Sequence, residues 1–338
     1  MDLTTPSGVR FGAGERPLRV WAVSDGRAGI ENQALGLAEA ISRQVSAEIE
    51  VKRISWPRWM RRTPSRLIPA STALLASGKD AIAPPWPDIW IGNGRAAIPL
   101  SIGVRKWSGG RTFVVQLQDP VRASRLFDLV IPPTHDRLMG DNVFPIIGTP
   151  HRVTPERLAE ARAAFAAELD PLPHPRVAVL IGGTAKAYDL GPDRAQLMGE
   201  EIARAISDAG GSLMLTFSRR TPDAARQILI ERLSGLPGVI WDERSPNPFF
   251  AFLGAADAVL VTEDSANMPA EAAASGAPVY LLKMDGGQPR RARFHQDLAE
   301  RGVSRPFAGT IDHWTYEPLR ETERAAAEVL KRRAERKS

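Results

Sequence analysis

Short apolar runs alternate with longer stretches of helical periodicity along almost the whole chain. This alternation is typical of parallel α/β architecture, in which each strand is followed by a helix that packs on the sheet. At 338 residues the chain is too long for one small core and fits two domains of this kind. We therefore expect an α/β fold with two Rossmann-like domains facing each other across a cleft, where ligands usually bind in such folds.

Hydrophobic periodicity assigns the individual elements. In the first part of the chain we expect strands near Leu18–Ser24, Glu48–Ile54, Asp88–Ile91, Arg111–Gln116 and Leu129–Ile131, and helices at Glu31–Arg43, Ser65–Ala76, Ala96–Trp107 and from Thr154 to Leu169. In the second part we expect strands at Val177–Ile181, Ser212–Phe217, Val239–Trp241, Ala258–Val261 and Pro278–Leu282, and helices at Asp193–Ala209, Asp223–Leu233, Pro248–Leu253, Ala266–Ser275, Arg290–Arg301 and Leu319–Arg336.

A proline-rich segment, Asp170–Pro175, is the best candidate for a linker, because its prolines can continue neither a helix nor a strand. We therefore assign residues 1–170 to an N-terminal domain and residues 176–312 to a C-terminal domain. The basic segment 315–338 is expected to return to the N-terminal domain.

Composition narrows the function without fixing it. The absence of cysteine excludes disulfides, thiolate metal sites and cysteine nucleophiles. The excess of 44 Lys and Arg over 39 Asp and Glu favours anionic partners, although a soluble protein of modest positive charge has the same composition. The start of the sequence lacks the pattern of a signal peptide, and no apolar run is long enough to span a membrane. We expect a cytoplasmic protein.

The turn Ser24–Gly29 follows the first expected strand and precedes a helix. Gly26 and Gly29 allow the backbone to turn tightly and approach a ligand, and the helix start presents N–H groups to an anion. The motif differs from the dinucleotide-binding GxGxxG pattern, so NAD binding is disfavoured. A plain strand-to-helix turn is the alternative interpretation.

Two further loops follow strands of the second part. Gly183, Thr184 and Lys186 belong to a Gly-Gly-Thr-Ala-Lys turn that suits a phosphate contact, although it lacks the order of a nucleotide triphosphatase loop. Ser218, Arg219 and Arg220 end the next strand, and either arginine could hold a diphosphate by charge-assisted hydrogen bonds. Both loops should lie at the same edge of one sheet. The arginines could also be merely solvated.

The segment Thr262–Pro278 resembles the donor-binding half of GT-B glycosyltransferases. In that fold a serine-containing turn faces the nucleotide diphosphate, and a glutamate on the following helix binds the ribose. The resemblance implies that Ser265 and Asn267 face phosphate and that Glu271 binds ribose. Glu263 and Glu271 also have the spacing of a glutamate pair in some retaining members. An exposed Glu271 without a function is the alternative interpretation.

The motifs together resemble the mitochondrial fission Elm-type family, whose bacterial members are sometimes labelled nucleoside-diphosphate-sugar epimerases. The segments that carry the resemblance are SDGRAGIENQALGLAEAI, GNGR, QLQDP, PPTHD, GGTAKAY, FSRRTP and TEDSANMPAEAAASGAPVYLL, and they extend from about Val20 to Phe307. Plant members recruit organelle division machinery at a membrane surface. The resemblance implies a GT-B-like fold, with the donor side in the C-terminal domain and the acceptor side in the N-terminal domain.

A glycosyl transfer with inversion needs a base that takes a hydroxyl proton. The candidates are Asp25, Asp119, His135 and Asp136, each near the end of an expected strand. The ordinary pKa of histidine, near physiological pH, makes His135 attractive, but a structural histidine and an Asp119 that only sets a turn are alternatives. No His/Glu cluster has ligand spacing, so we expect no metal and no cofactor, the nucleotide sugar being a substrate.

The segment Lys52–Arg66 interleaves cationic side chains with Trp56, Trp59 and Met60. Such a surface suits an acidic membrane or a lipid-linked acceptor, with nucleic acid the less favoured partner and an irregular loop with inward tryptophans the other alternative. We therefore expect a glycosyltransferase that uses a nucleotide sugar, peripheral at the inner face of the cytoplasmic membrane. A nucleotide-sugar epimerase and a non-catalytic scaffold at a membrane surface are the alternatives.

Overall fold

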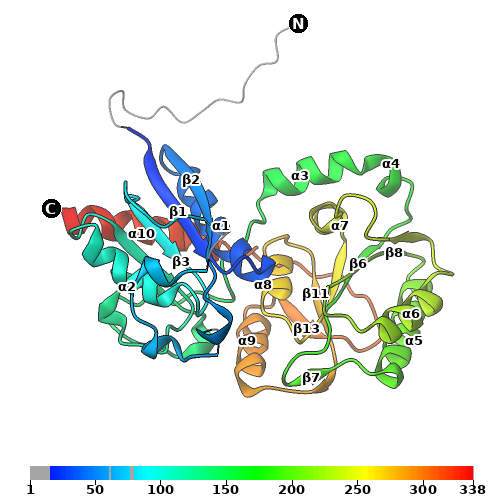
Figure 1. Ribbon diagram of the computed structural model, residues 1–338. Helices are drawn as coiled ribbons and strands as arrows, with labels where there is room; N and C mark the ends of the chain where they lie inside the picture. Colours follow the sequence, from blue (N-terminus) through cyan, green and yellow to red (C-terminus); the bar gives the residue numbers. More distant parts are fainter. Residues whose placement is uncertain (1–15, 61, 77–79, 338) are drawn as a thin grey trace, which may run out of the picture. The chain divides into compact units, whose positions relative to one another are not determined.

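The computed structural model describes residues 16–60, 62–76 and 80–337, and these residues form two compact units (Figure 1). Unit 1 comprises the chain up to Pro132 together with Leu138–Pro145 and the residues from Thr322 onwards. Unit 2 comprises Pro133–Arg137 and Ile146–Glu321. Each unit has its own parallel sheet and its own buried core.

Unit 1 contains a five-stranded sheet in which every neighbouring pair is parallel, with the strand order β2-β1-β3-β4-β5. Its strands are β1 (Leu18–Ser24), β2 (Ala47–Arg53), β3 (Ile89–Gly92), β4 (Phe113–Leu117) and β5 (Leu129–Ile131). Its α-helices are α1 (Ala28–Ser42), α2 (Ile98–Trp107) and, from its second residue onwards, α10 (Glu321–Lys337). Short 3-10 turns lie at Arg58–Met60, Ser65–Leu67, Thr72–Leu74 and Ser124–Leu126.

The core of unit 1 lies on both faces of this sheet, because successive side chains of a strand point to opposite sides. Trp21 and Val23 of β1 pack with Trp90 in a cluster that also contains side chains of α2 and of the segment 54–82. Val20 and Ala22 alternate with them along β1 and are buried as well. The continuous apolar run of β1 therefore reflects burial on both faces, as is typical of parallel sheets.

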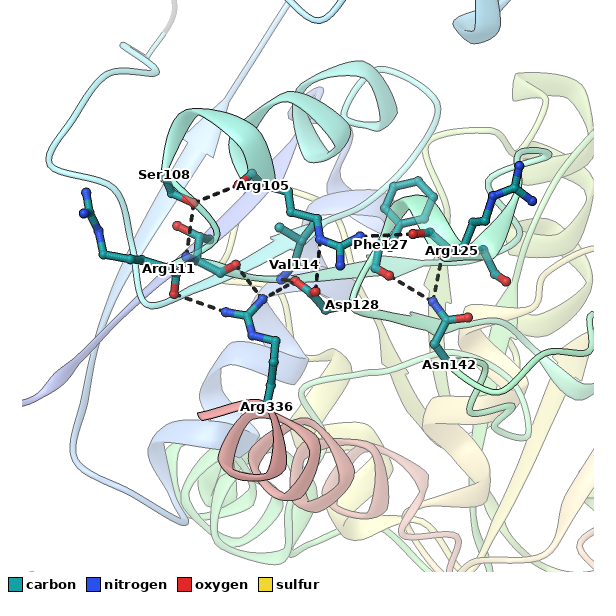
Figure 2. Close-up of polar contacts among 11 residues, drawn as sticks. Arg105, Ser108, Arg111, Val114, Arg125, Phe127, Asp128, Asn142 and Arg336 are labelled. Carbon is teal, nitrogen blue, oxygen red and sulfur yellow. Dashed lines mark hydrogen bonds and ion pairs between the residues drawn. The ribbon is translucent and has the colours of Figure 1, made fainter. Parts of the chain in front are cut away.

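A buried carboxylate fastens the last helix to unit 1 (Figure 2). The side chain of Asp128, just before β5, is 3% exposed. Its Oδ2 accepts hydrogen bonds from the backbone N–H of Val114 and from Arg336 of α10, both at 2.8 Å, and its Oδ1 lies 3.2 Å from Arg105 Nε of α2. One side chain thus connects β4, α2 and α10.

Unit 2 contains a six-stranded sheet, again with parallel neighbours only, in the order β13-β11-β10-β6-β8-β9. Its strands are β6 (Arg176–Ile181), β8 (Ser212–Phe217), β9 (Gly238–Ile240), β10 (Ala258–Thr262), β11 (Val279–Leu282) and β13 (Ser304–Pro306), and β7 (Tyr188–Asp189) pairs with β12 (Asp285–Gly286) in a small antiparallel sheet. Its helices are α3 (Pro155–Ala164), α4 (Ala166–Leu169), α5 (Pro192–Asp208), α6 (Asp223–Leu233), α7 (Phe249–Ala255), α8 (Asn267–Ala273) and α9 (Pro289–Glu300), with a 3-10 turn at Thr134–Asp136.

The central strand β6 shows how this sheet is covered. Val177, Val179 and Ile181 join a core cluster with side chains of α5 and α6. Ala178 and Leu180, which alternate with them, join a second cluster with side chains of α3, α7, α8 and α9. Helices therefore cover both faces, and the ends of the strands are left for ligand binding.

The structure departs from the expected organisation at the boundary near residue 170. Residues 146–170, which we expected in the N-terminal domain, belong to unit 2, because Leu158 of α3 and Leu169 of α4 pack in one core with Phe252 of α7. The proline-rich segment 170–175 lies within unit 2, where Arg176 donates a hydrogen bond to the carbonyl oxygen of Asp170 at 2.9 Å. The last helix, expected with the N-terminal domain, lies in unit 1 from Thr322.

The expected helix Ser65–Ala76 is wrong, since only two 3-10 turns form there. Pro69 explains the interruption, because the residue before a proline is pushed out of the helical region, and Ile68 has φ −85° and ψ 120°. The short strands β7, β12 and β13 were not expected. In the part of the chain that the structure describes, no helix is long and apolar enough to cross a bilayer. Residues 1–15, on which the expectation about a signal peptide rests, lie outside that part.

Candidate functional site

The sheet of unit 2 has its topological switch point between β6 and β10. From β6 the chain proceeds to β8 and β9 on one side, and from β10 to β11 and β13 on the other. Ligands of open parallel sheets bind at such a point, outside the carboxyl ends of the strands. The loops there begin with Gly182 after β6 and with Glu263 after β10. Two of the motifs identified in the sequence thus meet at one edge of the sheet.

Asp264 is the centre of this edge. Its carboxylate is buried and accepts hydrogen bonds from the Thr262 hydroxyl at 2.8 Å and from the backbone N–H of Gly183 at 3.3 Å. Arg220 pairs with the same carboxylate at 2.7 Å. Thr262 in turn accepts a hydrogen bond from the N–H of Gly182 at 2.7 Å. The side chain of Asp264 therefore joins the loops after β6, β8 and β10.

The two glycines are required by close packing. A Cβ atom on Gly183 would lie 2.0 Å from the carbonyl oxygen of Arg220, and one on Gly182 would lie 2.0 Å from Asp264 Oδ1. Thr221 strengthens the same contact, because its hydroxyl donates to the carbonyl oxygen of Gly182. Any larger residue at these positions would push the loops apart.

The turn after β8 presents two arginines. Ser218 Oγ accepts a hydrogen bond from the backbone N–H of Arg220 at 3.1 Å, which orders the turn. The Arg220 side chain is 48% exposed despite its pairing with Asp264. Arg219 is exposed, and its guanidinium has no partner among the described residues. The turn therefore has a cationic group available for an anion.

Helix α9 adds a third arginine to this edge. Arg291 lies in its first turn and is half-buried, and its Nε has no hydrogen-bond partner within the described residues. Burial lowers the pKa of Arg291, the positive charges of Arg290 and Arg220 add to the lowering, and the negative charge of Asp264 acts in the opposite direction. A cation is unfavourable at a helix N-terminus, where the backbone N–H groups are themselves positive. An anionic ligand would relieve both conditions.

The residues after β10 have local partners as well. Ser265 Oγ accepts from the backbone N–H of Met268 at 3.2 Å, and Asn267 Oδ1 accepts from the Thr149 hydroxyl at 3.1 Å. Glu263 accepts from the N–H of Met284 at 2.8 Å and lies 3.3 Å from Lys283 Nζ. These contacts order the loop.

Glu271 differs from these neighbours. It is half-buried in α8, and its carboxylate has no partner among the described residues. Desolvation raises its pKa to about 7. A desolvated carboxylate without a partner is typical of a group that meets a ligand.

Thr184 and Lys186 stand at the margin of the site. The Thr184 hydroxyl donates a hydrogen bond to Asp189 at 2.8 Å. Thr184 and Lys186 line a shallow hollow, together with Tyr188, next to the small β7–β12 sheet. Among the described residues, neither side chain forms a hydrogen bond or ion pair with the residues around Asp264.

His135 and Asp136 are placed differently from our expectation. They belong to unit 2, where Arg293 donates to the carbonyl oxygen of His135 at 3.1 Å and Arg290 Nε lies 2.5 Å from Asp136 Oδ1. Burial first, and then the nearby arginines, lowers the pKa of His135 to about 3. Its ring is therefore neutral and weakly basic at physiological pH, which removes our reason for choosing it as a base.

The remaining candidates lie in unit 1. Asp25 lines a cavity at the end of β1, and Asp119 lines another after β4. Gly26 has φ +80°, a conformation that favours glycine, and Gly29 is exposed in the first turn of α1. These four residues thus belong to the loops after β1 and β4 and to the start of α1, all in unit 1, whereas Asp264 belongs to unit 2.

Sequence reasoning missed Asp264, Arg291 and His295. His295 is half-buried one turn after Arg291, and desolvation together with Arg291 and Lys283 lowers its pKa to about 4. The run Pro289-Arg-Arg-Ala-Arg-Phe-His295 was the available signal. Among the described residues no group of acidic and histidine side chains could hold a metal ion.

Known structures share this fold. UDP-GlcNAc 2-epimerase from Methanocaldococcus jannaschii superposes with a TM-score of 0.53 at 11% identity, covering 94% of this chain and 100% of that chain. UDP-N-acetylglucosamine 2-epimerase from Rickettsia bellii gives a TM-score of 0.51 at 10% identity, covering 95% and 96%. Identities this low concern the fold alone. The two superpositions confirm the prediction of a GT-B-like fold with two Rossmann-like units.

Sequence relatives identify the family. "Mitochondrial fission protein ELM1" of Arabidopsis thaliana is 32% identical over 277 residues, which cover 74% of this chain but only 65% of that relative's length. An uncharacterized protein of Rickettsia prowazekii (strain Madrid E) is 25% identical over 362 residues, covering 93% of this chain and 98% of that protein. A sequence model of the family described as "Mitochondrial fission ELM1" matches residues 28–333. The chain therefore belongs to the mitochondrial fission ELM1 family.

Proposed function

We propose that unit 2 binds the diphosphate of a nucleotide sugar and that the protein is a glycosyltransferase. The observation that carries this proposal is Arg291, a half-buried arginine with an unpartnered Nε at the start of α9, within electrostatic reach of Arg220 and Asp264. Guanidinium groups bind phosphate oxygens by charge-assisted, often bidentate, hydrogen bonds. A diphosphate at the switch point would supply the missing partner.

The other residues take complementary roles in this proposal. Arg219 and Arg220 contact the diphosphate from the loop after β8, and the Gly182–Gly183 turn lets this loop pack closely against Asp264. Glu271 accepts hydrogen bonds from the ribose hydroxyls, which compensates for the desolvation that raises its pKa to about 7. The nucleotide sugar is then a substrate rather than a resident cofactor.

Transfer also requires a base for the acceptor hydroxyl. Asp25 and Asp119 are the proposed candidates, because both line cavities of unit 1, whereas Asp136 belongs to unit 2 and its side chain is only 2% exposed. We propose that unit 1 takes the acceptor.

Calorimetric titration with UDP, GDP, CMP and ADP sugars tests the donor site. We expect at least one of them to bind, and Arg291→Gln to weaken that binding about 10- to 100-fold, the range of a charge-assisted hydrogen bond. Arg219→Gln tests the same anion from an exposed position, where folding is not at risk. Arg204→Gln, an exposed arginine of α5, is the matched control. Absence of binding by all four classes contradicts the proposal.

A nucleotide-sugar 2-epimerase is the second candidate, because the proteins named above with the same fold carry that activity in their names. The two reactions differ in their need for an acceptor. Conversion of the sugar nucleotide in the absence of any acceptor indicates an epimerase, and no conversion until an acceptor is added indicates a transferase.

A non-catalytic scaffold at a membrane surface is the third candidate. It is favoured by Trp59 and Leu67 of unit 1, which are 75% and 65% exposed beside the exposed Arg58 and Arg62. Arg61 lies outside the described residues. A scaffold role predicts that Glu271→Ala leaves the cellular function intact while charge reversal at Arg58 and Arg62 abolishes it. The enzyme predicts the opposite pattern.

A further inference from the structure

Unit 1 has a topological switch point of its own. The strand order β2-β1-β3-β4-β5 places it between β1 and β3, because the chain leaves β1 toward β2 and returns to the other side of β1 with β3. A cavity of about 690 Å³ opens there, lined by Asp25 and Arg27 after β1 and by Arg95 and Ala96 after β3. This is where parallel sheets bind ligands, and the volume suits a small organic molecule.

One side of this cavity is apolar and fixed. Trp56, Met60 and Ile68 line it, and they are only 4%, 3% and 7% exposed. The indole N–H of Trp56 donates to the carbonyl oxygen of Ala96 at 3.0 Å, so the ring is held in place. An apolar group that displaced water from this side would gain the free energy of hydrophobic burial.

The other side of the cavity is cationic. Arg95 also lines a second cavity of about 330 Å³, together with Arg66 and Asp119. Both carboxylates of the two cavities are already engaged, since Asp25 lies 2.8 Å from Arg27 Nε and Asp119 accepts from the backbone N–H of Val121 at 2.7 Å. Around the two cavities Arg27, Arg66 and Arg95 stand against the carboxylates of Asp25 and Asp119, so the excess charge is positive.

The second cavity has a rigid, strained frame. Gln33 Oε1 accepts from Asn93 at 2.9 Å and from Gln118 at 2.8 Å, which joins α1 to the loops after β3 and β4. Gln118 and the β-branched Val121 have φ of 63° and 52°, in the left-handed region that non-glycine residues rarely adopt. Strain of this kind persists where the surrounding structure enforces it and is concentrated at ligand sites.

From these observations we propose that unit 1 binds an amphipathic phosphate, with the phosphate between Arg27 and Arg95 and the apolar chain against Trp56, Met60 and Ile68. The large apolar side chains of Trp59 and Leu67, on the same segment, are 75% and 65% exposed, which suits a ligand drawn from a membrane. This inference rests on the proposed function in one respect, since it names the chemical class of the acceptor at the cavity that Asp25 lines, but it does not depend on nucleotide binding by unit 2.

Calorimetric titration of the full-length protein with n-decyl phosphate, kept below its micelle concentration, tests the proposal. We expect saturable binding, with inorganic phosphate and n-decanol each at least about tenfold weaker, because each probe satisfies only one side of the cavity. Arg27→Ala should weaken decyl phosphate at least about tenfold. Ala96→Leu should block it by occupying the cavity, and Arg204→Ala should leave it unchanged.

Two kinds of result would overturn the proposed phosphate site of unit 1. Absence of binding, or equal binding by wild type, Arg27→Ala and Ala96→Leu, overturns the site. Inorganic phosphate that binds as tightly as decyl phosphate overturns the apolar half of the proposal. Titration of the same samples with UDP separates this outcome from failure of the donor site, since the two variants should not change UDP binding.

Discussion

The desolvated carboxyl group of Glu271 allows a quantitative test of the electrostatics of unit 2. Desolvation raises the pKa of its carboxyl to about 7, against an ordinary value of 4.5. Between these two values the folded protein holds a proton that the unfolded chain releases. The free energy of unfolding should therefore fall as the pH rises through this window, and Glu271→Gln should remove that fall.

The size of the effect follows from the pKa shift. One pKa unit corresponds to about 1.4 kcal/mol, so raising the pH from 5 to 8 should lower the unfolding free energy of the wild type by about 2 to 3 kcal/mol relative to Glu271→Gln. Urea unfolding at both pH values, followed by circular dichroism, measures this difference. In thermal unfolding it corresponds to about 5 to 10 °C for a unit of this size.

The control variant is Glu231→Gln, which removes an exposed carboxylate from α6. It should stay within about 0.5 kcal/mol of the wild type at both pH values. If Glu271→Gln differs from the wild type by the same amount at pH 5 and pH 8, the carboxylate is solvated in the folded protein. The ribose-binding role proposed for Glu271 would then lose its structural basis.

Three further predictions concern residues inside each unit. Gly183→Ala should abolish UDP binding and destabilise unit 2, because the added Cβ would lie 2.0 Å from a backbone oxygen. The control Gly235→Ala places its Cβ in open space, so it should change neither UDP binding nor stability. Calorimetric titration with UDP and thermal unfolding measure the two effects. His135→Gln should reduce the sensitivity of the fold to acid. Because the pKa of His135 is lowered in the folded protein, the unfolded chain takes up a proton first, and the unfolding free energy of the wild type should fall by about 2 kcal/mol between pH 7.5 and pH 5. Urea unfolding at both pH values should show this fall in the wild type and not in His135→Gln. Asp128→Ala should destabilise unit 1 by about 2 to 3 kcal/mol in urea unfolding, since the N–H of Val114 and two arginines lose their partner, and Asp128→Asn, which can still accept from Val114, should cost less.

Much of the fold could be predicted because buried parallel strands are continuous apolar runs bounded by turn residues. The strands Leu129–Ile131 and Ser212–Phe217 and the helix Asp223–Leu233 begin and end where periodicity places them. The same reasoning gave a wrong helix after Ser65, because the apolar spacing of this segment suits a helix while Pro69 interrupts one. The division near residue 170 failed because whether α3 packs on one sheet or the other depends on side chains distant in sequence.

The candidate site was predictable only in part for a related reason. The carboxyl ends of parallel strands share one edge, so the loops at Gly183 and Ser265 could be placed together from their order along the chain. Asp264 could not be distinguished from its neighbours, because its role depends on the close approach of two glycines. Arg291 could not be identified either, since only tertiary packing shows that it is half-buried and that its Nε lacks a partner.

Amide hydrogen exchange, measured by mass spectrometry with and without saturating UDP, tests whether a nucleotide diphosphate binds at the switch point of unit 2. We expect slower exchange in residues 182–187, 218–222 and 263–271 and in the first turn of α9, and a loss of this protection in Arg291→Gln. Unchanged exchange in all four segments of the wild type at saturating UDP would contradict such binding.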